Sequence, residues 1–163
     1  MGFVFYAFCA IVVVICLYIW TYFRTQGMVE IHQATLADFQ FDLLREKQPL
    51  VIDDRVVSLA DLHRMWFGSN ITSEFRLDGT ETWHKNKFKY LVVHAEQEGD
   101  IYLYPAGKRM IEGNIPDTEE SLIAVHLLPR QVLIIPFRWH YLVMPPMQIS
   151  CLGVHDYVTY MLP

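Results

Sequence analysis

The sequence IIPFRWHY at residues 134–141 is the most informative stretch of this chain. An apolar run leads into Pro136, and a Trp-His-Tyr cluster follows after two further residues. Such a run is typical of a buried β-strand, and its proline marks the strand's end. Because side chains alternate between the two faces of a strand, a one-residue shift moves a histidine from the inside of a barrel to the outside. The position of His140 within this cluster therefore decides which chemistry the sequence can support.

The chain opens on an uncharged segment long enough to cross a bilayer. From Phe3 to Phe23 no residue is charged, and a helix of that length measures about 30 Å, the thickness of a hydrocarbon core. A cleaved signal peptide is the alternative, but it requires basic residues before a shorter apolar core. The two preceding residues carry no charge. We therefore expect residues 1–23 to be an uncleaved transmembrane anchor, with residues 3–23 in contact with the lipid bilayer.

The end of this segment indicates its orientation. Trp20 lies among aromatic residues of the kind that prefer the membrane interface, and Arg24 is the first basic residue of the chain. The positive-inside rule then predicts a single-pass membrane protein with its globular part on the cytoplasmic face. Cys151 is the one cysteine beyond the segment, so the domain contains no internal disulfide. Residues 24–30 are predicted to be a juxtamembrane linker and residues 31–163 a single domain.

The charge of the chain excludes one class of partner. Its 13 basic and 18 acidic residues give a formal net charge of −5. A nucleic-acid surface requires clustered lysine and arginine in excess, so we expect no nucleic-acid partner.

The domain begins with two predicted helices. Apolar residues spaced for one helix face, with Thr35 as the N-cap, predict a helix up to about residue 47. Ser58 is placed to cap a second helix that ends before Gly68. Between the two helices, residues 50–52 predict a short buried strand.

The rest of the domain is β-like. Residues 107–121 are polar and predict a surface loop, and residues 157–161 are expected to close a barrel or to pack outside it. This pattern indicates an α+β domain whose β part is a sandwich or barrel. Strands are expected at residues 88–94, 100–104, 121–128, 131–135, 141–144 and 148–154.

Three short motifs support a family resemblance. Residues 49–52 (PLVI), residues 103–105 (LYP) and the Pro136…Trp139 pair occur in an order and spacing that resembles the cupin-like, Jumonji-C type domain of Fe(II)/2-oxoglutarate hydroxylases. The resemblance covers most of residues 29–160. It implies a cupin-like double-stranded β-helix, or jelly roll, preceded by two N-terminal helices.

The resemblance also assigns positions to the iron ligands. The family holds iron with a His-x-Asp/Glu pair and a distal histidine, and a lysine binds 2-oxoglutarate. His84 falls at the first position, but Asn86 replaces the carboxylate, and no lysine lies in residues 95–104. At the distal position stands Tyr141, with His140 one residue early. A neutral amide is a weak ligand for a divalent metal. His84, Asn86 and His140 are thus the candidate metal residues, in a site that has lost parts of its pattern.

We interpret the domain as a pseudoenzyme that retains the fold without its chemistry. The expected role is structural or interactive, with no cofactor and with a protein partner. Small tethered proteins of this kind are similar to cupin-like proteins of large DNA viruses and algae, so a viral protein of the virion membrane is one expectation.

Three alternatives stay open. One is a membrane-tethered Fe(II)/2-oxoglutarate hydroxylase that uses His84, a displaced His140 and the carboxylate of Asp78 or Glu81. Another is a different metal site that adds His94 to the two histidines. The third is a sugar- or small-ligand-binding cupin with an aromatic lining drawn from Trp83, Tyr90, Tyr102, Trp139 and Tyr141.

Overall fold

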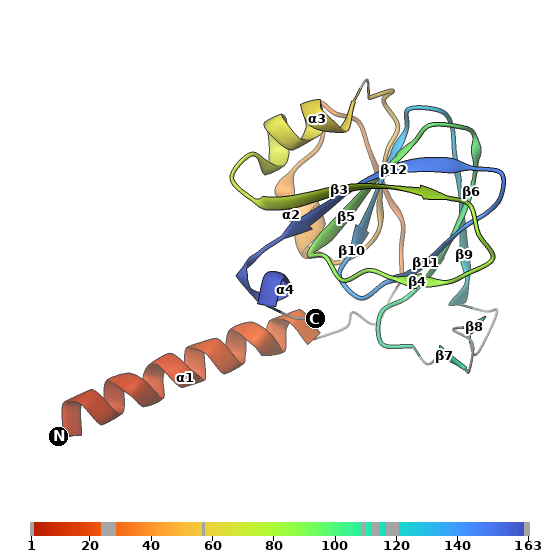
Figure 1. The fold of residues 1–163 in the computed structure, drawn as a ribbon. Coiled ribbons are helices and arrows are strands. Elements are labelled where there is room, and N and C mark those ends of the chain that lie inside the picture. The colour runs from red at the N-terminus through yellow and green to blue at the C-terminus, as the bar shows by residue number, and fades with distance from the viewer. Residues whose placement is uncertain are drawn as a thin grey trace.

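Two β-sheets packed face to face form the domain in this computed structural model (Figure 1). The structure describes residues 2–23, 29–56, 58–108, 110–111, 115–116 and 121–161. One sheet contains β1 (His32–Ala34), β2 (Leu50–Ile52), β10 (Val132–Pro136), β5 (Tyr90–Ala95), β12 (Gln148–His155) and β3 (Ile71–Asp78), in that spatial order. The other contains β4 (His84–Lys85), β11 (His140–Val143), β6 (Gly99–Tyr104) and β9 (Ile123–Leu127). The expected α+β fold with short strands after two helices is thus confirmed in outline.

The central strands of the larger sheet are buried on both faces. In β10, Leu133 and Ile135 point into the core between the sheets, whereas Val132 and Ile134 point to the outer face. Strands covered on both sides read as continuous apolar runs rather than alternating ones. This double burial is the reason for the unbroken apolar run that precedes Pro136.

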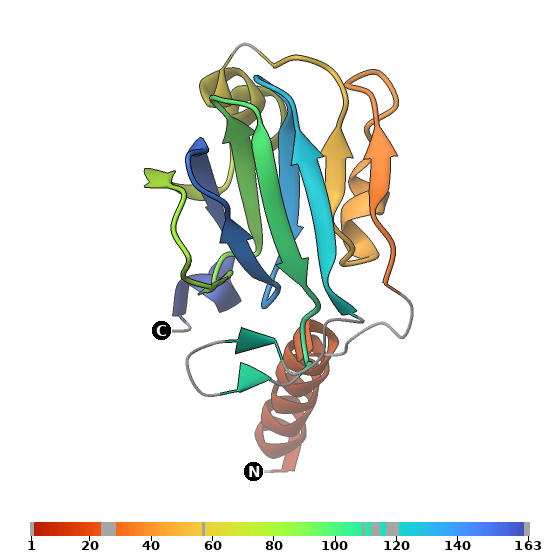
Figure 2. The same ribbon diagram turned by 90° about the vertical axis from the view of Figure 1, so that its right-hand side faces the viewer.

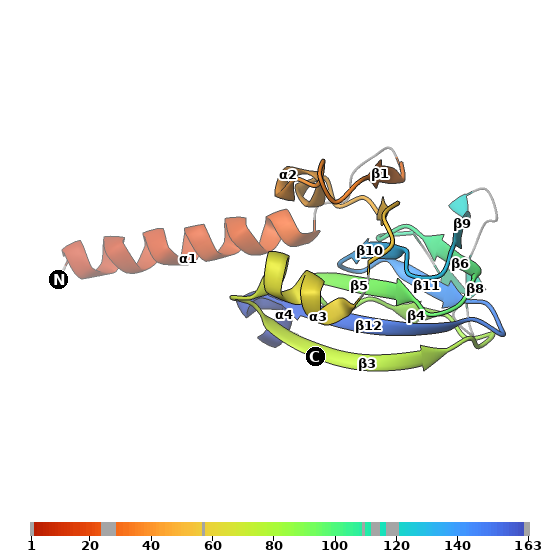
Figure 3. The same ribbon diagram turned by 90° about the horizontal axis from the view of Figure 1, so that it is seen from above.

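Short helices cover the outer face of the larger sheet, opposite the smaller sheet (Figure 1). They are α2 (Phe41–Arg45), α3 (Leu59–Leu62) and the π-helical turn η1 (His63–Phe67). The predicted cap of the second helix is confirmed, because the Ser58 hydroxyl accepts a hydrogen bond from the Asp61 amide at 3.3 Å. Figure 3 shows α2 and α3 from above.

The first predicted helix is shorter than expected. Thr35 and Asp38 close a local turn, in which the Thr35 hydroxyl donates to the Asp38 carboxylate at 2.6 Å and accepts from the Asp38 amide at 3.2 Å. Gln40 is then extended (φ −128°), and the helix begins at Phe41. The residues before the turn form β1, which pairs in parallel with β2. A side chain that caps a helix and one that closes a turn make the same local hydrogen bond, which is why the sequence pattern was misleading.

Two C-terminal expectations are refined. Residues 157–161 form a helix, α4 (Tyr157–Met161), because the Asp156 carboxylate accepts hydrogen bonds from the amides of Val158 (3.1 Å) and Thr159 (2.9 Å). In the predicted surface loop, β7 (Met110–Ile111) pairs with β8 (Ile115–Pro116). Residues 109, 112–114 and 117–120 of that loop lie outside the described residues.

The N-terminal helix α1 (Gly2–Phe23) extends away from the sheets (Figures 1 and 2). Its described side chains, residues 4–20, are exposed. Within the described part of the chain, no helix has both the length and the apolar character needed to cross a membrane. The predicted transmembrane helix is therefore not supported by the structure. Of the predicted linker, residues 24–28 are outside the described residues.

Gly153 on β12 provides a test of the packing. A methyl group at this position would overlap the ring carbons of Phe88, and that ring is itself packed edge-on against His155 at 4.8 Å. We expect Gly153→Ala to lower the free energy of unfolding by about 1–3 kcal/mol, the usual cost of overpacking. Gly68→Ala is the control, because its new methyl group would lie 3.4 Å from the nearest atom, an ordinary contact. Denaturant unfolding of both variants measures the difference, and equal stabilities would contradict this packing.

Candidate functional site

Asn86, expected at the carboxylate-ligand position, holds backbone segments together. Its side chain is buried (1% exposed), and Nδ2 donates to the carbonyl oxygens of Ile135 at 2.8 Å and Pro136 at 2.9 Å. Oδ1 accepts from the Phe88 amide at 2.9 Å. Both donor hydrogens of the amide are thus used, and the side chain fixes the end of β10.

The backbone of Asn86 completes this arrangement. Its amide donates to the Trp139 carbonyl at 2.8 Å, and its carbonyl accepts from the Arg138 amide at 2.9 Å. Asn86 therefore holds the turn between β10 and β11 through four hydrogen bonds, two made by its side chain and two by its backbone. We call residues 136–139, held in this way, the Asn86-bound turn.

His84 and Tyr141 lie side by side on the inner face of the smaller sheet. They are directly opposed in the β4–β11 pair, and their rings stack with centroids 5.4 Å apart. Tyr141 belongs to the core between the sheets, and burial raises the pKa of its phenol well above the ordinary value. The phenol is therefore neutral at physiological pH. The residue that stands at the distal position is thus part of the apolar core.

His140 lies on the opposite face of the same strand. It is opposite Lys85 in the β4–β11 pair, and its ring is half-buried. Burial, followed by the nearby charges of Lys85 and Arg138, lowers the pKa of the imidazole. The structure thus brings His84 next to Tyr141, but leaves His140 on the outer side of the sheet.

The other candidate residues are also dispersed. Asp78 and Glu81 are exposed, and Nε2 of His94 donates to the Val56 carbonyl at 3.0 Å across the outer face of the larger sheet. Across the residues that the structure describes, no three histidine, cysteine or acidic side chains are grouped for a metal ion. Cys151 is buried in the core, which raises its pKa to about 12.

The aromatic residues considered for a sugar site do not line a common cavity. Trp139 and Tyr141 are part of the core between the sheets, and the indole Nε1 of Trp139 donates to the Lys47 carbonyl at 3.1 Å. Tyr90 packs instead in the outer cluster beneath the helices. These three aromatic residues are therefore divided between the two hydrophobic clusters.

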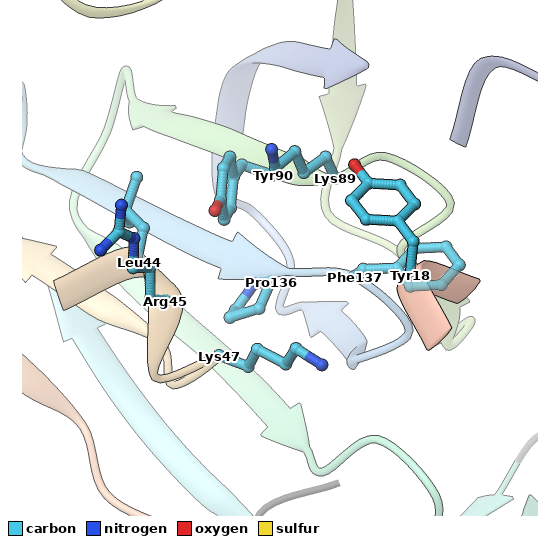
Figure 4. A pocket seen from close by; sticks show the side chains of 8 residues that line it. All are labelled: Tyr18, Leu44, Arg45, Lys47, Lys89, Tyr90, Pro136 and Phe137. Atoms are coloured by element: carbon cyan, nitrogen blue, oxygen red, sulfur yellow. The ribbon is translucent and has the colours of Figure 1, made fainter. Parts of the chain in front are cut away.

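A cavity of about 280 Å³ lies where α1 meets the domain (Figure 4). Its charged lining consists of Arg45, Lys47 and Lys89, and burial lowers the pKa of Lys89. Its other walls are aromatic and apolar: Tyr18, Leu44, Tyr90, Pro136 and Phe137. We call this cavity the junction pocket.

The junction pocket is built from segments far apart in the sequence. Tyr18 of α1 donates to the Asp156 carboxylate at 3.4 Å, and Lys89 forms an ion pair with the same carboxylate at 3.6 Å. Sequence reasoning missed this site, because its lining residues come from segments that only the folded chain brings together. In the structure β4 ends at Lys85, so that Lys89 is free to reach a different part of the surface.

Comparison with solved structures finds two sugar-nucleotide epimerases among the similar chains, both at low TM-score. RmlC from Streptococcus suis, solved in complex with dTDP-D-xylose, is 9% identical over 67% of this chain and 62% of its own, with a TM-score of 0.33. The dTDP-4-dehydrorhamnose 3,5-epimerase from Bacillus anthracis str. Ames, solved with TDP and PPi bound, is 12% identical over 53% of each chain, with a TM-score of 0.30. This chain thus spans about three fifths and about half of their lengths. No protein-family model and no curated protein matches the sequence.

Replacing Asn86 by the carboxylate of the family pattern tests its role. Asn86→Asp would remove both donors from the carbonyls of Ile135 and Pro136 and place an oxygen against them. Since each unsatisfied buried group costs about 1–3 kcal/mol, we expect the free energy of unfolding to fall by about 2–5 kcal/mol. Thermal or urea unfolding measures this loss.

Asp78→Asn is the matched control, because it exchanges the same two side chains at an exposed site and is expected to change stability by less than about 0.5 kcal/mol. An Asn86→Asp variant as stable as the parent chain, with newly acquired iron binding, would show that position 86 is a ligand position.

Proposed function

We propose that this chain is a single-pass membrane protein carrying a catalytically degenerate cupin-like domain with a structural or interaction role. The observation that supports the degenerate site is Asn86, whose amide is committed to the backbone of the Asn86-bound turn. A ligand at this position would have to give up those hydrogen bonds. We propose no cofactor, in place of the Fe(II) and 2-oxoglutarate of the hydroxylases.

The exposed apolar surface of α1 supports the proposed membrane anchor. The described side chains of this helix, residues 4–20, cover about 26 Å of its length, against about 30 Å for a hydrocarbon core. They include large exposed apolar groups, such as Phe8 (64% exposed) and Trp20 (58%). An apolar surface of this extent marks a contact with a membrane or a protein. The side chains of Phe3 and Phe23, and all of Arg24, lie outside the described residues.

Other features at the C-terminal end of α1 suit a membrane interface. The short helix α4 lies beside this end (Figure 1) and exposes Tyr157 (83%), Tyr160 (62%) and Met161 (80%). Tyrosine favours the headgroup level of a bilayer. The basic lining of the junction pocket faces the same region, and lysine and arginine near a membrane surface attract anionic lipids. These observations support a bilayer as the first partner.

A protein partner is the second proposed contact. A domain held at a membrane and without a reaction centre is suited to linking that membrane to another protein. A viral or other membrane-associated assembly is the setting we propose, with the domain on the cytoplasmic face or, in a virus, at the virion membrane.

Charges placed in the middle of α1 test the anchor. In Val12→Asp/Val13→Asp, each aspartate is expected to cost about 2.5–3.5 kcal/mol at the centre of a bilayer. The parent chain, expressed in cells, should stay in the membrane pellet after alkaline carbonate extraction, and the variant should move to the supernatant. Tyr157→Asp/Tyr160→Asp adds the same charges on α4 and should leave the chain in the pellet. A parent chain that carbonate releases would refute the anchor.

Metal analysis of the purified full chain separates the proposed role from the hydroxylase alternative. We expect less than about 0.1 iron per chain after reconstitution with Fe(II), since His84 and His140 face opposite ways. His84→Ala should leave this value and the melting temperature within about 2 °C of the parent. Stoichiometric iron that His84→Ala abolishes, together with turnover of 2-oxoglutarate, would establish the hydroxylase instead.

A further inference from the structure

One edge of the larger sheet is open at β3. Among the strands that the structure describes, β3 is last in the order of this sheet and pairs only with β12. Figure 3 shows it as the margin of the sheet. In an antiparallel pair, backbone amide and carbonyl groups point alternately towards the neighbouring strand and away from it. About half of the backbone groups of this eight-residue strand therefore face away from β12.

β3 lacks several features that usually keep a sheet edge from pairing. Proteins protect such edges by very short strands, prolines, β-bulges or lysines. β3 has eight residues, and its register with β12 runs unbroken from Ile71 to Asp78. Its sequence, ITSEFRLD, contains no proline and no lysine. The edge is thus long and regular, which favours the addition of another strand.

The other edge strands of the two described sheets offer less. β1 has three residues and β4 has two. β9 has five, and its one ionisable side chain, His126, is already bound within its own sheet. The imidazole lies 2.8 Å from the Asp100 carboxylate and 3.2 Å from that of Glu98. β3 is therefore the edge with the greatest capacity for a new partner.

The charges on the outer face of β3 alternate in sign. Phe75 and Leu77 pack against the core between the sheets, so Glu74, Arg76 and Asp78 lie on the opposite face of the strand. All three are exposed, and Glu74 and Asp78 form no ion pair within the described residues. Arg76 lies 3.5 Å from the Glu96 carboxylate, but its side chain is still 81% exposed. The strand thus presents an exposed arginine between two exposed acids.

This charge pattern is complementary to itself in one register. A two-fold axis perpendicular to the sheet pairs β3 with β3 of a second copy in antiparallel orientation and keeps inward side chains inward. With the axis at Phe75, Glu74 of each copy lies opposite Arg76 of the other. Moving the axis by one residue either way places Glu74 opposite Glu74 or Arg76 opposite Arg76. Like charges directly opposite each other are destabilising, so the charges select the register centred on Phe75.

We propose that β3 pairs with β3 of a second copy of this chain, in the register centred on Phe75, to form a symmetric dimer with one continuous sheet. Two Glu74–Arg76 pairs and a central pair of Phe75 rings add to the backbone hydrogen bonds. A hollow of about 500 Å³ beside β3, with Glu74, Arg76 and Glu96 in its lining, leaves room for the side chains of the second copy. Because each copy has one β3, the assembly closes at two chains. The inference goes beyond the proposed function, since it requires neither the membrane anchor nor a degenerate site.

Sedimentation equilibrium of the full chain in a density-matched neutral detergent tests the pairing. A contact of one strand per copy is smaller than a standard protein interface, so we expect a dissociation constant of about 10–100 μM. Glu74→Arg and Arg76→Glu each put like charges in both cross-strand pairs and should weaken the dimer about tenfold. These variants change the net charge in opposite directions, so a general charge effect would not weaken both. Glu81→Arg is the matched control: it makes the same exchange at an exposed position outside β3, and it should dimerise as the parent does.

Restoring the complementarity should restore the dimer. Glu74→Arg/Arg76→Glu exchanges the two charges and should return the dissociation constant to within about threefold of the parent's. A mixture of the Glu74→Arg and Arg76→Glu chains, labelled with two fluorophores, should form heterodimers about as tightly as the parent forms its dimer, because opposite charges then face each other again. A parent chain that stays monomeric at about 1 mM would overturn the proposal. Equal dissociation constants for the parent and both single variants would also overturn it, because the contact would then lie elsewhere.

Amide hydrogen exchange of the unmutated chain covers the case in which a variant fails to fold. The amides of β3 that face away from β12 are open in a single copy and hydrogen-bonded in the dimer. Raising the chain concentration from about a tenth of the dissociation constant to about ten times its value should slow their exchange about fourfold, as the monomer fraction falls. The edge amides of β9 are the internal control and should exchange at an unchanged rate. Exchange in β3 that does not depend on concentration would overturn the pairing, whatever carbonate extraction shows about the anchor.

Discussion

The hydrogen bonds of Asn86 are the interaction on which the rest of the site depends. One amide side chain reaches the carbonyl oxygens of Ile135 and Pro136, which lie 49 and 50 residues away in the sequence. Its backbone groups bind two residues of the following turn, Arg138 and Trp139. A buried polar group that is fully paired adds specificity to its surroundings, whereas a partly paired one destabilises them. The path of the chain from β10 through the turn into β11 is therefore specified largely by the hydrogen bonds of Asn86.

This constraint separates the two faces of the smaller sheet. Because the Asn86-bound turn is fixed, β11 enters the sheet with Tyr141 inward and His140 outward. Tyr141 then belongs to the apolar core between the sheets. His140 and Arg138 are directed to the outside, where they meet Lys85. The residues that would mark a metal centre in the family pattern thus contribute to packing on one face and to a positive pocket on the other.

Local features of the fold could be predicted from the sequence, and long-range ones could not. The Ser58 cap and the apolar run of β10 depend on neighbours within a few residues, so the sequence alone predicts both features. Thr35 shows the limit of such reasoning, because its hydrogen bond to Asp38 serves a turn as well as a helix. The sequence also places His140 one residue before the distal ligand position of the family pattern. Because side chains alternate along a strand, this shift predicts that His140 lies on the opposite face from Tyr141. The role of Asn86 could not be predicted, because its partners are known only once the chain has folded.

The Asn86-bound turn also relates the junction pocket to a second basic pocket, the outer pocket, which is lined by Lys85, Gly107, Lys108, Arg138 and His140. Pro136 and Phe137 line the junction pocket, while Arg138, one residue further, lines the outer pocket. Lys89 and Lys85 lie on either side of Asn86 and reach the same two pockets. The charged side chains of Lys85, Lys89 and Arg138 therefore line two different pockets. Since the amide of Asn86 holds residues 85–89 and the Asn86-bound turn together, the same hydrogen bonds fix the separation between the pockets. Asn86 thus holds together the two segments that line these pockets.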